Sequence, residues 1–278
     1  MGNERKRTRQ PQLDTTVAAI QRRYGPWAVA RGETSRIAGS AASTSSIPTG
    51  FALLDRALGL GGLPKGGICE LVGPATSGKT TLALKILAQA QRGGREMGGS
   101  ETRPYRVGGA QGENLVGYID QALYFDADYA YRCGVDLSRL LTGAPQDLAE
   151  ALAMVESLTR SGSLAALVLD TLDFLWDDPG AAHSLAATLN RLRAPLARSG
   201  TILLVLHDSP DTQSPALSAL GHSSNVRLQV VRERWIRLHG DVRGYEARVE
   251  VLKNRLGPAG QVVKLEIEFN GTVQGNGL

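Results

Sequence analysis

At residues 73–80 the chain reads Gly73-Pro74-Ala75-Thr76-Ser77-Gly78-Lys79-Thr80, and a second threonine, Thr81, follows. This segment fits the pattern G-x-x-x-x-G-K-[ST] of a phosphate-binding loop. The apolar run Ile68–Val72 before it predicts a buried strand, and residues 80–91 after it predict a helix. Glycines let backbone N–H groups face phosphate oxygens, and the start of a helix adds partial positive charge. We therefore expect the loop to hold the phosphates of ATP.

Three side chains are expected to serve the phosphates and a metal ion. Lys79 brings a full positive charge to the β- and γ-phosphates, and the hydroxyl of Thr80 is a ligand of the kind that Mg²⁺ takes. The apolar stretch 164–170 ends in Asp170, whose carboxylate is expected to reach Mg²⁺ through its water shell. The sequence thus predicts a Mg²⁺-ATP site with Thr80 and Asp170 as its metal residues. A glycine-rich turn without a ligand is the alternative interpretation of the loop.

Apolar runs alternate with helical patterns after residue 46, which is typical of a mostly parallel α/β sheet flanked by helices. Strands are predicted at 68–72, 116–120, 164–170 and 201–207, and helices at 80–91, 147–160 and 183–198, the last kinked or ended by Pro195. From residue 225 the apolar period is two, and antiparallel strands are predicted at 226–231, 235–239, 248–253 and 262–269. The Gly-rich, polar residues 92–114 are predicted to form a surface loop.

The first 46 residues differ in composition from the rest. Residues 1–36 carry eight Arg or Lys residues against three acidic residues, a short amphipathic helix is predicted at 13–24, and residues 39–46 read as a flexible linker. We therefore divide the chain into a basic arm with helix and linker (1–46) and a nucleotide-binding core (47–278). A basic arm fits contact with nucleic acid or an acidic partner, and a solvated tail is an equally good interpretation.

Composition also bears on location. No run of eighteen apolar residues occurs, so no membrane-spanning helix is expected. The start of the chain is polar and basic, unlike a secretory signal. Cys69 and Cys133 have no metal-site spacing and read as buried thiols of a reducing compartment. These features predict a cytoplasmic protein.

Motifs on both sides of the phosphate loop resemble the RecA recombinase family. They are Ile47-Pro48-Thr49-Gly50 with Leu54-Asp55 and Gly61-Gly62-Leu63-Pro64 upstream, and Tyr118-Ile119-Asp120, Asp126, Tyr129-Ala130, Gly134-Val135-Asp136 and Lys253-Asn254-Arg255 downstream. The resemblance runs from about residue 13 to residue 269. It implies a RecA-like nucleoside-triphosphatase core that forms ATP-dependent filaments in DNA recombination, in repair and in the SOS response to DNA damage.

The resemblance also implies roles for single residues. Tyr129 is expected to stack on adenine, and Asp126 to contact the edge of that base. Lys253 and Arg255 are expected to reach the γ-phosphate of ATP on the adjacent copy, with ordinary strand charges as the alternative. The helix at 13–24 is similar to the family's N-terminal helix, which docks on the neighbouring subunit.

Two departures from the family concern hydrolysis. Ala122 stands where the family has its catalytic glutamate, so ATP hydrolysis is expected to be weak or absent, with Asp120, Asp126 and Asp128 as candidate substitutes. His207-Asp208 stands where the family has Asn-Gln, whose glutamine senses the γ-phosphate.

Two further departures concern DNA. The segments expected to form the DNA-binding loops, 176–180 and 209–221, contain no Lys or Arg, and Trp176 is a candidate either for base stacking or for packing. The chain also stops soon after the last predicted strand, before the family's C-terminal domain.

We expect a RecA-like, ATP-binding protein of DNA repair and homologous recombination that binds single-stranded DNA or a recombinase filament. It is expected to self-associate into a filament or ring, or to assemble together with a recombinase. The alternative is an accessory protein of a translesion-synthesis polymerase complex (ImuA type), in which the fold serves protein contacts. Those proteins usually have a degraded phosphate loop, unlike Lys79-Thr80 here.

Overall fold

The computed structural model describes residues 14–23, 45–93, 114–172, 179–208, 215–269 and 273–277. The chain divides into two compact units, Met1–Thr44 and Ser45–Leu278. In the first unit the structure describes a helix at residues 14–23, inside the predicted range 13–24. Residues 94–113 of the predicted surface loop and Trp176 lie outside the described residues. Among the described helices, none is both long and apolar enough to cross a membrane.

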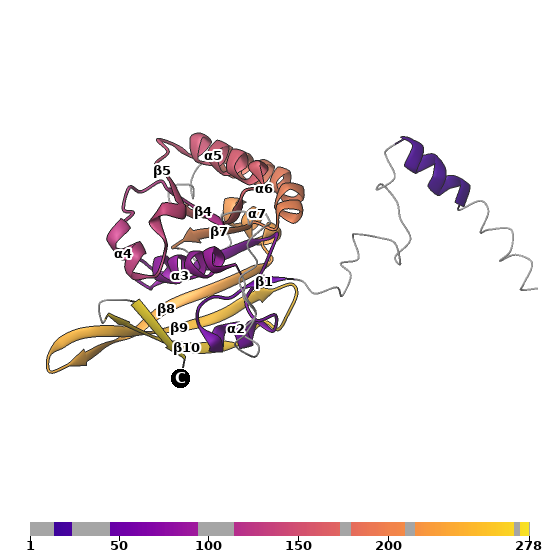
Figure 1. Ribbon diagram of the computed structural model, residues 1–278. Helices are drawn as coiled ribbons and strands as arrows, with labels where there is room; N and C mark the ends of the chain where they lie inside the picture. The colour runs from indigo at the N-terminus through magenta and orange to yellow at the C-terminus, as the bar shows by residue number, and fades with distance from the viewer. Residues whose placement is uncertain are drawn as a thin grey trace, which may run out of the picture. The chain divides into compact units, whose positions relative to one another are not determined.

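A nine-stranded sheet forms the centre of the second unit, in the order β11-β10-β9-β8-β3-β7-β6-β4-β5 (Figure 1). The strands are β3 (Ile68–Val72), β4 (Leu115–Asp120), β5 (Leu140–Gly143), β6 (Leu164–Asp170), β7 (Ile202–His207), β8 (Val226–Leu238), β9 (Asp241–Asn254), β10 (Val262–Phe269) and β11 (Val273–Gly277). Pairs from β8 to β5 are parallel, and those from β8 to β11 are antiparallel. A small separate sheet pairs β1 (Ser46–Ile47) with β2 (Leu63–Pro64). The predicted α/β sheet with antiparallel strands at its C-terminal end is confirmed.

Helices cover both faces of this sheet (Figure 1). They are α2 (Ala52–Leu58), α3 (Lys79–Arg92), α4 (Ala127–Arg132), α5 (Leu148–Ser161), α6 (Pro179–Ser199) and α7 (Pro215–Ser223), with a 3₁₀ turn, η1, at Leu137–Arg139. Successive strand residues point to opposite faces. On β7, Leu204 and Leu206 therefore pack with α2, α3 and α4, whereas Leu203 and Val205 pack with α5, α6 and α7.

Three sequence predictions were wrong in detail. β8 and β9 form one long antiparallel ribbon where three shorter strands, 226–231, 235–239 and 248–253, were predicted. Pro195 lies inside α6 and does not end it, because Leu192 and Leu196 on either side are both buried at 1% exposure and hold the helix on the sheet. The predicted loop 209–221 is helical from residue 215 onward.

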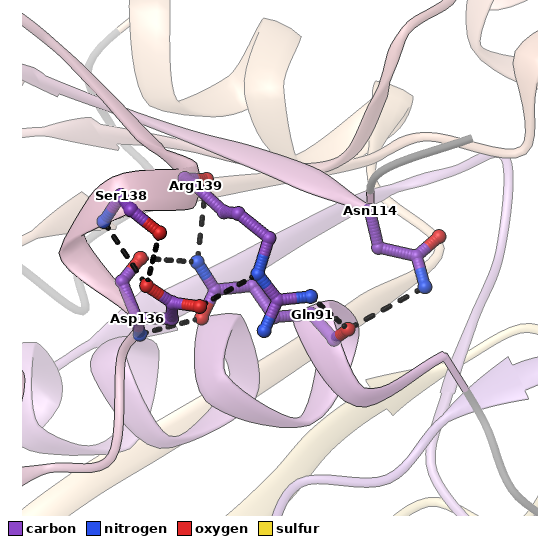
Figure 2. Close-up of polar contacts among 5 residues, drawn as sticks. All are labelled: Gln91, Asn114, Asp136, Ser138 and Arg139. Carbon is purple, nitrogen blue, oxygen red and sulfur yellow. Dashed lines mark hydrogen bonds and ion pairs between the residues drawn. The ribbon is translucent and has the colours of Figure 1, made fainter. Parts of the chain in front are cut away.

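A buried amide fixes the end of α3. Gln91, 3% exposed, accepts from Asp136 N at 2.8 Å and donates to the carbonyl oxygens of Asp136 and Arg139 at 2.9 and 3.2 Å (Figure 2). Arg139 and Asn114 both donate to the carbonyl oxygen of Gln91, at 3.1 and 3.4 Å. Buried polar groups are stable only when hydrogen-bonded. This network thus holds α3, and with it the phosphate loop at the other end of the helix, against η1 and the start of β4.

Candidate nucleotide-binding site

The loop 73–78 has the backbone shape that its glycines predict. Gly73 follows β3 and donates its N–H to His207 O at 3.3 Å, and Gly78 precedes α3 with φ +106°. A Cβ at Gly73 would collide with the carbonyl of Val230, and one at Gly78 would lie 2.7 Å from the hydroxyl of Tyr245. Only glycine tolerates these positions without strain. The loop therefore bends tightly around the start of α3, as a phosphate cradle requires.

Lys79, the first residue of α3, is held inside the loop. Its Nζ donates to Gly73 O at 2.5 Å and to Pro74 O at 3.1 Å, and it pairs with Asp208 Oδ1 at 2.6 Å. The side chain is 8% exposed. Its ammonium group is thus fixed at the mouth of the loop, next to the end of β7.

Two tyrosines enclose the next turn of α3. The hydroxyls of Tyr129 and Tyr245 lie 2.7 and 3.0 Å from Thr81 Oγ1. Burial is the largest cause that raises the pKa of Tyr129, to about 12. With residues 76–81 they line a cavity of about 190 Å³. Tyr129, which the family resemblance assigned to adenine, therefore lies beside the phosphate loop. Tyr245 was not singled out because it comes from β9, 164 residues from Thr81.

Thr80 and Asp170, the two residues expected to hold Mg²⁺, both form hydrogen bonds with the hydroxyl of Tyr118. Tyr118, 1% exposed on β4, donates to Asp170 Oδ2 at the end of β6. Burial and the charge of Asp170 raise the pKa of Tyr118 far above its usual value, and a hydrogen bond with Thr80 opposes this. The hydroxyls of Tyr118 and Thr80 and the carboxylate of Asp170 thus lie next to one another. Oxygen donors of this kind fit Mg²⁺, which combines one or two protein ligands with phosphate oxygens and water.

Two carboxylates at the turn after β4 are hydrogen-bonded to backbone N–H groups. Asp120 accepts from the backbone N–H groups of Ala122 at 3.1 Å and Phe125 at 2.6 Å, so both its oxygens stabilise the turn. Asp126 caps α4 by accepting from Tyr129 N at 2.9 Å. Two of the three candidate substitutes for the missing glutamate are therefore engaged in local structure.

The β8–β9 ribbon also contacts the phosphate loop. Arg232 donates to Thr76 O at 3.1 Å, and its guanidinium lies 4.1 Å from the ring centroid of Trp235. Trp235 in turn meets the ring of Tyr245 edge-on, with centroids 6.0 Å apart. The contact between Arg232 and Thr76 could not be predicted from the sequence, because these residues are 156 positions apart.

Lys253 and Arg255 lie at the opposite end of β3 from the phosphate loop. Val226 pairs with Cys69 on β3 and with Asn254 on β9, whereas the loop follows Val72. Lys253 donates to Gly221 O at 2.5 Å and Ser224 O at 2.7 Å, and Arg255 donates to His222 O. Both cations therefore bind carbonyls at the end of α7, and the structure does not bring them to the phosphate loop of their own chain.

Further arginines accompany this pair. Arg193 and Arg255 line a cavity of about 270 Å³ at the amino end of β3. Burial, then the charge of Arg255, are the main causes that lower the pKa of Lys253, with smaller contributions from Arg227 and Arg193. Like charges this close favour an anionic partner. Arg193 was missed in the sequence, where it reads as one more polar position of a helix.

A fully buried carboxylate connects the two regions. Glu70 on β3 is 0% exposed, and its Oε2 lies 2.8 Å from Arg227 Nε and 3.2 Å from His207 Nε2. Burial opposes ionisation, but the hydrogen bond with His207 and the charge of Arg227 prevail and lower the pKa of Glu70. The carboxylate therefore holds strands β3, β7 and β8 together next to the loop.

Comparison with known proteins adds independent information. Residues 11–100 match the family model of the RecA N-terminal domain. Protein RecA of Rubrobacter xylanophilus is 32% identical over 288 residues, which cover 95% of this chain and 76% of that protein. Protein RecA of Thermus thermophilus is 34% identical over 283 residues, covering 92% and 75%. The crystal structure of the RadB recombinase is similar in fold, with a TM-score of 0.61 and 20% identity over 84% of this chain and 99% of that one.

Proposed function

Because the chain belongs to the RecA family of recombinases, we propose that it binds Mg²⁺-ATP and acts in DNA recombination and repair. The observation that carries ATP binding is the position of Lys79. Its ammonium group is fixed at the mouth of a glycine loop, beside Thr80 and within reach of a tyrosine-lined cavity. When bound, Mg²⁺ would neutralise phosphate charge, and Thr80 and Asp170 are the side chains that would hold it.

Isothermal titration of Mg²⁺-ATP tests this binding. The wild type is expected to give saturable heat, and Lys79→Ala is expected to abolish it, because the loop then lacks its only full positive charge among residues 73–81. Lys65→Ala is the matched control, since Lys65 is exposed and precedes β3. Equal heats for the two variants, or none from a folded wild type, would contradict the proposal.

We also propose that hydrolysis is weak. Ala122 cannot polarise water, and the carboxylates of Asp120 and Asp126 are held by backbone N–H groups. A positioned general base contributes about 10²- to 10⁴-fold to a rate. Ala122→Glu is therefore expected to raise the single-turnover hydrolysis rate at least about tenfold. A wild-type rate that the substitution does not change would show that another group acts as the base.

Self-association is proposed to complete the nucleotide site. Lys253 and Arg255 lie away from the loop of their own chain, next to a cavity that Arg193 also lines. We propose that these cations contact the terminal phosphate of a nucleotide on a second copy. Light scattering with and without Mg²⁺-ATP is expected to show larger assemblies with nucleotide, and Arg255→Ala is expected to reduce them. Assemblies independent of both would contradict this role.

Binding of single-stranded DNA is proposed to use the basic arm and the end of the β8–β9 ribbon. The ribbon presents Arg237, Arg243 and the 42% exposed Trp235, a combination of cations and an aromatic ring that suits a strand with unstacked bases. Fluorescence anisotropy over a salt series is the test. Replacing Arg237 and Arg243 by Ala is expected to lower the slope of log affinity against log salt by about 0.7 per lost phosphate contact.

The matched control for the ribbon is Arg160→Ala on α5, which pairs with Glu156 on an exposed helix. A wild type that binds no single-stranded DNA at low salt would contradict the DNA proposal and leave ATP binding as a separate question. No observation on the described residues favours the alternative of a translesion accessory protein.

A further inference from the structure

The ammonium group of Lys79 is already saturated by its own chain. An ammonium group has three protons to donate. In this structure its three acceptors are Gly73 O at 2.5 Å, Pro74 O at 3.1 Å and Asp208 Oδ1 at 2.6 Å. A phosphate oxygen can therefore bind Lys79 only by taking the place of one of these acceptors.

Of the three, Asp208 is the acceptor that a ligand can displace. The two carbonyls belong to the loop backbone, whose shape is fixed by Gly73 and by the hydrogen bond from Ser77 N to Pro74 O at 3.1 Å. The Asp208 side chain is 44% exposed and follows the last residue of β7. It can rotate towards solvent without breaking the loop. A ligand oxygen would then occupy the position that Asp208 Oδ1 now holds.

The displaced carboxylate would stay close to that oxygen. His207 O accepts from Gly73 N, so the end of β7 is bonded to the first residue of the loop. Asp208, the next residue, therefore cannot move far from the bound phosphates. Repulsion between like charges grows with the charge of the ligand, and solvent around the 44% exposed Asp208 side chain reduces it without removing it at this short range.

We propose that Asp208 is a specificity-determining residue that reduces the preference of this site for nucleoside triphosphates over diphosphates. It acts as an internal counter-ion to Lys79 and as a repulsive neighbour of the terminal phosphate. A triphosphate carries more negative charge than a diphosphate, so the repulsion from Asp208 lowers its binding affinity more. This inference rests on the proposed nucleotide binding and adds which phosphate state the site selects.

The test compares dissociation constants for Mg²⁺-ATP and Mg²⁺-ADP by isothermal titration. Asp208→Asn removes the charge and keeps the size of the side chain, and the two backbone carbonyls still hold Lys79. The ratio Kd(ATP)/Kd(ADP) is expected to fall about tenfold relative to the wild type, mainly through tighter ATP binding. Asp241→Asn, an equal charge change at the start of β9, is expected to leave the ratio unchanged.

The outcomes separate this inference from the proposed function. If both nucleotides bind and Asp208→Asn changes the ratio no more than Asp241→Asn does, the inference is wrong and nucleotide binding stands. The same conclusion follows if Asp208→Asn weakens ATP selectively, because Asp208 would then support the terminal phosphate. If folded wild type and Asp208→Asn bind neither nucleotide, the proposed function fails and the inference fails with it.

Discussion

Tyr118→Phe removes one oxygen atom from the centre of the candidate site. Tyr118 is 1% exposed, and its hydroxyl donates to Asp170 and is hydrogen-bonded with Thr80. A hydrogen bond to a charged group contributes about 1.5–3 kcal/mol to stability. Asp170 is half-buried, so water can partly replace the lost donor. We therefore expect the free energy of unfolding to fall by about 1.5 kcal/mol, the lower end of that range.

Urea denaturation measures this loss, and its pH dependence gives a second test. The pKa of Tyr118 is raised in the folded state, so the stability linked to its neutral form is complete below the unfolded pKa of about 10 and is lost as the pH rises above it. The Tyr118→Phe variant lacks this ionisable hydroxyl. The difference in stability between wild type and variant is therefore expected to shrink above pH ~10.

Tyr118→Phe is also expected to weaken Mg²⁺ binding. Partners that orient a metal-ligating carboxylate typically contribute 10- to 100-fold to metal affinity. We expect the Mg²⁺ concentration that half-saturates nucleotide binding to rise about tenfold in Tyr118→Phe. Tyr124→Phe is the control, because Tyr124 is 87% exposed on the same stretch of chain. If both variants match the wild type in stability and in Mg²⁺ dependence, the hydroxyl of Tyr118 does not hold Asp170, and the reasoning is refuted.

Three other substitutions test neighbouring features. Gly78→Ala places a Cβ 2.7 Å from the Tyr245 hydroxyl at φ +106°, so a loss of about 1–3 kcal/mol in thermal unfolding and at least tenfold weaker nucleotide binding are expected. Glu70→Gln removes the fully buried charge that pairs with the half-buried Arg227 and is expected to cost about 3 kcal/mol in urea denaturation. The hydrogen bond from Arg234 is the largest cause that lowers the pKa of Glu246, to about 2, so the stability from that carboxylate is present above pH ~4 and is lost as the pH falls towards 2. Arg234→Met should raise this pKa in an NMR titration, while Lys264 continues to lower it.

The parts of the fold that the sequence predicted are those with local causes. The phosphate loop needs glycine at two backbone positions, an apolar strand before it and a helix after it, and all these signals lie within 24 residues, 68–91. Asp170 was found in the same way, since it ends an apolar run. Boundaries also agree closely where both faces of a strand are buried, as in β3 and β6.

The parts that were missed depend on contacts between distant segments. Tyr118 was recognised only as part of a family motif, and its bond to Asp170, 52 residues later, was not predicted. Tyr245 and Arg232 reach the loop only because β8 pairs with β3 and β9 pairs with β8. The bond between Lys79 and Asp208 spans 129 residues. Side-chain partners of this kind follow from the order of strands in the sheet, which composition and periodicity do not determine.

The strand order also explains why the proposed nucleotide site needs a second copy of the chain. β3 has five residues, and a strand rises about 3.3 Å per residue, so about 13 Å separate its two end residues. The phosphate loop lies at one end, and Lys253 and Arg255 lie at the other, bound to carbonyls of the α7 end. This separation exceeds the reach of either side chain. If these cations contact a nucleotide phosphate at all, that nucleotide is bound to another copy, so phosphate contact and assembly would have to occur together.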